Sequence, residues 1–146
     1  MMILAADTSF LFSLFGKDSW TEKARQMSRR WKEPLQICVF NSLELTNAAL
    51  QAEFAGHLEP GLGNLIVARF QGDIDSGRLV HPTFNPGKAV ARATELSRKH
   101  ALTGGHRTYD VLLVAAALEM KATDFFTFDS RQAKLAKSEG LRVKGV

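Results

Sequence analysis

Short apolar segments alternate with helical patterns along this chain, and this alternation constrains its fold most strongly. Five segments have the length and composition of buried strands, at residues 2–6, 35–40, 79–80, 125–128 and 141–143. Helical spacing of apolar residues separates them. Strands that alternate with helices in this way form a parallel sheet that is covered on both faces by helices. The pattern therefore predicts an α/β fold.

Capping signals indicate where several helices begin. Ser19 with Glu22 and Asn41 with Glu44 have the spacing of capping boxes. Residues 109–121 are apolar on nearly every side, which predicts a buried helix. Further helices are expected at 62–76, from Pro86 to the Gly104-Gly105 pair, and at 130–138.

Length and composition favour one folded unit. The 146 residues are 45% hydrophobic, so a single domain over 1–146 can bury a sizeable core. The only cysteine, Cys38, has no internal disulfide partner, which fits a reducing compartment. No apolar run approaches the roughly 20 residues of a membrane span. Asp7 interrupts the apolar N-terminus and no basic residue precedes it, so we expect no signal peptide and a cytoplasmic protein.

The charge balance is compatible with a polyanionic partner without requiring one. The formal net charge is +4, from 19 Lys and Arg against 15 Asp and Glu. Basic residues gather at 17–33 and 88–107. Solvated helix faces explain such clusters as readily as nucleic-acid contacts do.

Four acidic residues stand where predicted strands give way to helices. Asp7 and Asp129 directly follow strands, while Glu44 and Asp110 lie in the first turns of helices. Parallel strands end at one edge of a sheet, and ligands bind in the crevice at that edge. The four carboxylates are therefore expected to converge there.

Each of these carboxylates has a second explanation, because acidic residues are common helix caps. Four such caps crowded on one edge would repel one another. A hard divalent cation such as Mg²⁺ or Mn²⁺ relieves that repulsion, since it prefers carboxylate oxygens. If the four side chains converge, the pattern predicts a metal site.

Four segments resemble, in kind and in order, the acidic segments of PIN-domain nucleases. They are ILAADTS, LELTNAAL, RTYDVLLVAAAL and FFTFDSRQAKLAKSEGLRV, and they lie between residues 3 and 143. The VapC-like toxins of bacterial toxin–antitoxin pairs are the subgroup that fits best. The resemblance implies a three-layer α/β/α sandwich whose central parallel sheet has the order 3-2-1-4-5. It also implies metal-dependent endonucleolytic cleavage of RNA.

The resemblance also implies which residues form the active site. Its catalytic acids and ligands of Mg²⁺ or Mn²⁺ correspond to Asp7, Glu44, Asp110 and Asp129. Residues that could support them or touch the substrate are Thr8, Thr127, Asn47 and Arg107. A helix-face hydrogen bond for Asn47 and a loop salt bridge for Arg107 are equally good explanations.

Two further residues, Asp124 and Trp20, are expected to lie outside the site. Asp124 lies before the strand that leads to Asp129, so we expect it to be a loop residue at the far end. Trp20 shares one predicted helical face with Trp31, which favours a core or dimer interface over a base-stacking surface.

The resemblance implies partners as well as a substrate. A toxin of this kind acts on RNA, forms a homodimer and is held by a cognate antitoxin that covers the acidic edge. Two alternatives stay open from the sequence. One is a binding module with little or no cleavage. The other is a nuclease of RNA processing or of DNA, because phosphate chemistry is common to these substrates.

Overall fold

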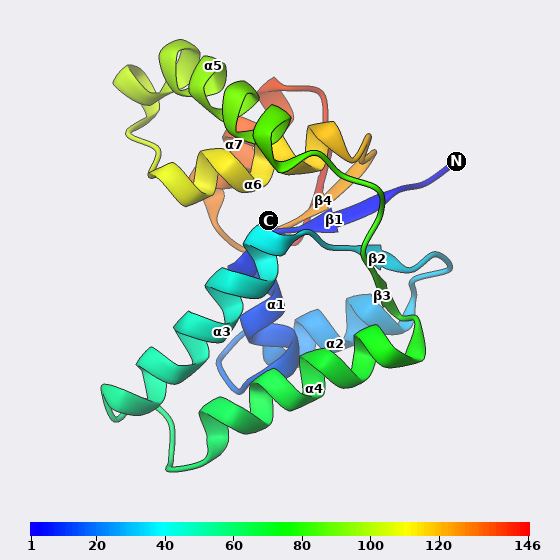
Figure 1. Ribbon diagram of the computed structural model, residues 1–146, viewed down its shortest axis with the longest axis vertical. Coiled ribbons are helices and arrows are strands. Elements are labelled where there is room, and N and C mark those ends of the chain that lie inside the picture. Colours follow the sequence, from blue (N-terminus) through cyan, green and yellow to red (C-terminus); the bar gives the residue numbers. More distant parts are fainter.

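The computed structural model describes residues 1–146 and contains a five-stranded parallel sheet in the order β3-β2-β1-β4-β5 (Figure 1). The strands are β1 (Leu4–Ala6), β2 (Leu35–Gln36), β3 (Leu79–Val80), β4 (Asp124–Phe126) and β5 (Arg142–Lys144). The helices are α1 (Thr8–Phe15), α2 (Thr21–Arg29), α3 (Val39–Phe54), α4 (Leu62–Ser76), α5 (Pro86–Gly104), α6 (Thr108–Glu119) and α7 (Ser130–Ser138). The predicted α/β/α sandwich and strand order are confirmed.

The helices form two layers, one on each face of the sheet. Helices α1 to α4 cover one face and α5 to α7 cover the other (Figure 1). Each layer closes over its own apolar core. None of the helices is both long enough and apolar enough to cross a membrane.

Successive side chains of β1 and β4 alternate between the two cores. Leu4 and Ala6 of β1 pack into the α1–α4 side, whereas Ala5 packs into the α5–α7 side. In β4, Phe126 and Phe125 divide in the same way. Successive side chains of a strand point to opposite faces, so a strand buried on both faces is apolar throughout. This explains why β1 and the Phe125–Phe126 part of β4 show no polar alternation in sequence.

Helix α1 was not predicted from the sequence. Asp7 caps it, and its Oδ1 accepts a 2.8 Å hydrogen bond from the backbone N–H of Phe10. Six of its eight residues are buried, including Thr8 and Ser13. A short helix that is buried nearly all round lacks the polar face by which a helical period is recognised.

Helix α3 begins earlier than predicted, and the predicted cap is wrong. The N-cap is Cys38, so the second strand stops at Gln36 and Asn41 lies inside the helix. The Asn41 side chain accepts from the backbone N–H of Cys38 at 3.0 Å and donates to the carbonyl of Ala6 at 3.2 Å. Asn41 therefore links the start of α3 to the end of β1.

Helix α2 also begins differently. Ser19 makes no capping box with Glu22, because the N-cap is Trp20 and it offers no side-chain hydrogen bond. Asp18 organises this turn instead, accepting a 2.8 Å hydrogen bond from the backbone N–H of Trp20. An Asp that bonds the backbone two residues on is a standard turn former.

Candidate active site

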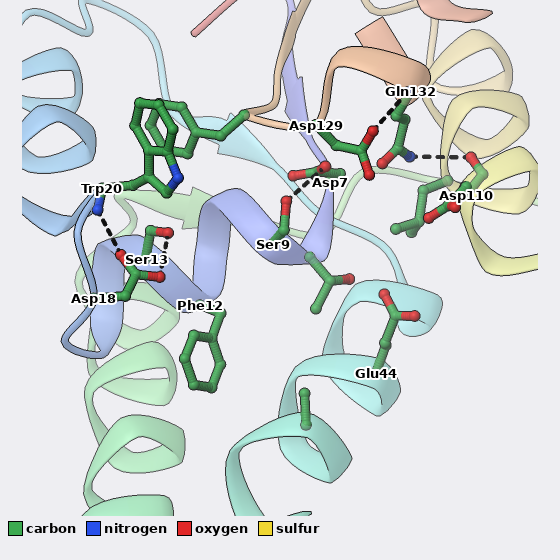
Figure 2. Close-up of a pocket in the computed structure, with 14 residues that line it drawn as sticks. Asp7, Ser9, Phe12, Ser13, Asp18, Trp20, Glu44, Asp110, Asp129 and Gln132 are labelled. Atoms are coloured by element: carbon green, nitrogen blue, oxygen red, sulfur yellow. Dashed lines mark hydrogen bonds between the residues drawn. The ribbon is translucent and has the colours of Figure 1, made fainter. Parts of the chain in front are cut away.

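A pocket of about 470 Å³ lies where the helices leave the central strands. Its walls include all four predicted acids, Asp7, Glu44, Asp110 and Asp129. Figure 2 shows the Glu44 carboxylate pointing from α3 toward the other three side chains. The convergence expected from the sequence is therefore present, and we call this pocket the acidic pocket.

Two of the acids leave neighbouring strands side by side. Asp7 follows β1 directly, and Asp129 follows β4 after two residues. The strands pair in parallel with Ala6 opposite Phe126, so both acids emerge at the same edge. Asp129 also caps α7, where its Oδ1 accepts from the backbone N–H groups of Arg131 and Gln132. Helix capping and membership of the pocket are thus compatible for these residues.

The Asp7 carboxylate is held by three donors. Thr127 Oγ1 donates to Oδ2 at 2.6 Å, Ser9 Oγ donates to the same oxygen at 2.8 Å, and the Phe10 N–H donates to Oδ1. Thr127 is completely buried and Asp7 is 1% exposed. A carboxylate fixed in this way is pre-oriented for a ligand.

Burial disfavours the charged form of the carboxylates in the acidic pocket. Desolvation raises the pKa of Asp7 to about 6 and also raises the pKa values of Glu44 and Asp110. The negative charge of Asp129 adds to this effect at Asp7 and Asp110, although Arg107 offsets part of it at Asp110. None of these four carboxylates forms an ion pair. No ion pair of the protein therefore neutralises the negative charge of the pocket.

The donor set fits a hard divalent cation. Carboxylate oxygens surround the pocket, and Thr8 contributes a buried hydroxyl that makes no hydrogen bond. That hydroxyl also lies near enough to Glu44 to lower the pKa of its carboxyl group. No three acidic, His or Cys side chains already surround one ion position. Spread-out carboxylates suit Mg²⁺, which takes one or two directly and keeps several waters.

The supporting residues fall into two groups. Thr8 lines the acidic pocket, and Thr127 lies behind it in contact with Asp7. Asn47 is exposed on α3 and does not line the pocket. Arg107 is the exposed N-cap of α6 and also lies outside the lining, although its charge reaches Asp110.

The prediction that Asp124 is a loop residue is wrong. Asp124 is the first residue of β4, is 1% exposed and pairs with Arg142 at 2.7 Å. The partner lies opposite Asp124 on the neighbouring strand β5, a pairing that only the sheet register reveals. Its position at the opposite end of β4 from Asp129 is as expected.

Several pocket residues were missed by the sequence analysis. Asp18 and Ser13 line the pocket and bond to each other at 2.8 Å, and Gln132 donates to the Asp110 carbonyl at 3.0 Å (Figure 2). The spacing of Gln132 three residues after Asp129 is a capping signal that could have drawn attention to it. Nothing in the sequence singles out Ser13.

The interpretation of Trp20 and Trp31 as one helical face is also wrong. Trp20 precedes α2, is 42% exposed and lines the acidic pocket. Trp31 follows the helix and packs against the core, with its ring 5.5 Å from that of Phe126. The two indoles therefore belong to different environments.

Known proteins resemble this chain in structure but not detectably in sequence. No family model and no curated protein matches this chain. Solved structures do match along nearly its whole length. The toxin VapC20 of Mycobacterium tuberculosis, described as cleaving the sarcin-ricin loop, has 15% identity and a TM-score of 0.68, with 98% of each chain covered. VapBC-1 of nontypeable Haemophilus influenzae has 14% identity and a TM-score of 0.64, covering 98% of this chain and 97% of that chain.

A third match is VapBC2 of Rickettsia felis bound to a promoter DNA fragment, at 17% identity and a TM-score of 0.62, again with 98% of each chain covered. This chain has the VapC-like PIN fold. In the strand order 3-2-1-4-5, the chain adds β2 and β3 on one side of β1 and β4 and β5 on the other, so the strand order reverses between β1 and β4. Ligands of open α/β sheets bind at such a switch point. Asp7 and Asp129 follow these two strands.

Proposed function

We propose that this protein is a metal-dependent endoribonuclease that hydrolyses RNA phosphodiester bonds in the acidic pocket. One observation carries the proposal: four carboxylates from separate elements converge in one pocket without a cationic partner. Such a cluster is unfavourable unless a cation enters it. The fold shared with the VapC toxins supports the same conclusion.

Asp7 and Asp129 would hold Mg²⁺ or Mn²⁺, with Asp110 and Glu44 bound directly or through water. When bound, the ion polarises the phosphate and lowers the pKa of a coordinated water. Thr127 keeps the Asp7 carboxylate facing the pocket. Glu44 orients the attacking water and accepts its proton, a role that its raised pKa suits. Gln132 holds the Asp110 segment in place through its backbone carbonyl.

We further propose that the protein is the toxin of a toxin–antitoxin pair and forms a homodimer. Matching structures include VapBC complexes and a toxin–antitoxin complex from Klebsiella pneumoniae at 14% identity and a TM-score of 0.59. Exposed apolar side chains along one face of α3 offer a surface for protein contacts: Val39, Leu43, Leu50 and Phe54. The antitoxin would cover the acidic pocket and place a basic side chain among the carboxylates.

Cleavage of a mixed pool of cellular RNAs by purified protein tests the activity. Reactions would contain Mg²⁺, Mn²⁺ or EDTA, with a single-stranded DNA pool run in parallel. Asp7→Asn is the site variant, and Asp75→Asn, at an exposed acid of α4, is the matched control. We expect metal-dependent RNA cleavage that only Asp7→Asn abolishes.

Each other outcome points elsewhere. Cleavage that persists in EDTA or in Asp7→Asn would contradict the proposed site. Preferential cleavage of DNA would make DNA, not RNA, the substrate. No cleavage under any condition would favour a binding module. The toxin assignment is tested separately. A small adjacent open reading frame should encode an antitoxin whose co-expression restores growth, and harmless expression of the protein alone would oppose it.

A further inference from the structure

A column of stacked aromatic rings runs from the core to the rim of the acidic pocket. Phe10 is fully buried, and its ring stacks on Phe128 with 5.3 Å between centroids and 29° between planes. Phe128 stacks in turn on Trp20, at 4.8 Å and 11°. Trp20 ends the column and is 42% exposed. Figure 2 shows its indole at the edge of the pocket, beside Asp18.

The Trp20 indole is the solvent-exposed end of this column and lines the acidic pocket. Phe128 covers one face. The nearest cation, Lys23 Nζ, is 5.6 Å from the Trp20 centroid and 5.8 Å from the Phe128 centroid. Nearly equal distances place it beside the stack and not over the indole. Its ammonium donates to the Gly145 carbonyl at 2.8 Å, which leaves further donors for a phosphate oxygen.

The column is anchored next to the acids of the acidic pocket. Phe128 lies between Thr127, which bonds Asp7, and Asp129 in the chain. The backbone N–H of Trp20 is fixed by Asp18, which is itself held by Ser13 of α1. A ring that is already fixed loses little entropy when a ligand stacks on it.

From this geometry we infer that Trp20 is a stacking platform for one unpaired base of the RNA substrate, next to the phosphate that is cleaved. The inference rests on the proposed function and adds a substrate class to it. Every base has a π face, so the platform tolerates any sequence. A base inside a continuous duplex has no free face, so the platform selects single strands, loops and bulges.

Binding measured without cleavage tests the platform. The background is Asp7→Asn in EDTA, which blocks cleavage and removes one charge that repels phosphate. The ligands are a short single-stranded oligoribonucleotide and an abasic oligomer of equal length. Trp20→Ala should weaken binding of the base-bearing ligand by about 5- to 150-fold, the range for one stacked base. The abasic oligomer should bind both proteins equally.

Two further variants separate stacking from packing. Trp20→Phe keeps a ring on Phe128 and should lose less affinity than Trp20→Ala. Leu102→Ala removes a large apolar side chain that is 98% exposed on α5 and should leave affinity unchanged. Unfolding curves of all variants would show that Trp20→Ala remains folded under the binding conditions.

Fluorescence supplies a readout that a purely structural role would not change. The chain has two tryptophans, so Trp20→Phe leaves Trp31 as the only one. Oligoribonucleotide should quench emission in the Trp20 protein and not in Trp20→Phe. Unchanged affinity in Trp20→Ala, equal losses for abasic and base-bearing ligands, or no quenching would each overturn the platform. If wild-type protein still cleaves RNA, these outcomes leave the proposed function intact.

Discussion

Thr127 Oγ1 donates a 2.6 Å hydrogen bond to Oδ2 of Asp7, and 120 residues of chain separate the two. The same hydroxyl oxygen accepts the backbone N–H of Asp129 at 3.0 Å. One buried side chain therefore aligns the acids that follow β1 and β4. Because Thr127 is completely buried, its hydroxyl cannot hydrogen-bond to solvent instead.

Thr127→Val should reduce RNA cleavage by about 10- to 100-fold, the usual cost of losing a group that orients a metal ligand. Valine keeps the shape but cannot donate to Asp7, so the carboxylate loses its alignment and its pKa rises further. Thr127→Ser keeps the hydroxyl and should stay within severalfold of wild type. Single-turnover cleavage rates would check this, and equal losses in both variants would mean that packing, not the hydroxyl, matters.

Asp7→Asn should stabilise the metal-free protein at neutral pH. The folded-state pKa of about 6 lies above the ordinary aspartate value of 3.8, so the folded state binds a proton more tightly than the unfolded chain. Stability from this group is complete below about pH 4 and is lost as pH rises through about 6. The loss amounts to about 3 kcal/mol. Denaturant unfolding of both proteins from pH 4 to 8 measures the difference.

That difference between Asp7→Asn and wild type should be small at pH 4 and greatest at pH 8, with the variant more stable. A variant that is less stable at pH 8 would show that the three hydrogen bonds to Asp7 outweigh its desolvation. Asp75→Asn, on the exposed face of α4, should show no such trend.

Divalent metal should stabilise the wild-type protein more at pH 8 than at pH 5. The raised pKa values of Asp7, Glu44 and Asp110 mean that protons compete with the ion at the lower pH. A concentration of 100 times Kd adds about 2.7 kcal/mol to the free energy of unfolding. Thermal melts with Mn²⁺, reversed by EDTA, would detect this gain. A shift of equal size in Asp7→Asn would place the ion elsewhere.

Asp129→Asn should impair cleavage but not stability, whereas Asp124→Asn should impair stability but not cleavage. Asparagine is as good an N-cap as aspartate, so Asp129→Asn should leave stability nearly unchanged while cleavage falls by orders of magnitude. Asp124→Asn weakens the pairing with Arg142 and should lower stability by about 1–3 kcal/mol. Its cleavage should remain within about twofold. Loss of cleavage in Asp124→Asn, in protein that is still folded, would reverse the choice of fourth acid.

Local sequence was informative wherever neighbouring residues decide the structure. Asn85 does accept the N–H of Lys88 as a cap, and Gly77 ends α4 with a positive φ of 84°. The acids at the strand ends could be named because parallel strands finish at one edge. The start of α3 was predicted wrongly because Asn41 bonds Ala6 of β1, a contact far away in the sequence.

The sequence by itself determined the α/β alternation, the likeness to PIN domains and the four acids, since each depends on residue type and short-range order. Only the tertiary structure decided what lies around those acids. The buried Thr127–Asp7 bond, the Asp124–Arg142 pair and the Trp20–Phe128 stack all join segments that are remote in sequence or set by a loop. Such contacts follow from the packing of whole layers, and no local pattern encodes them.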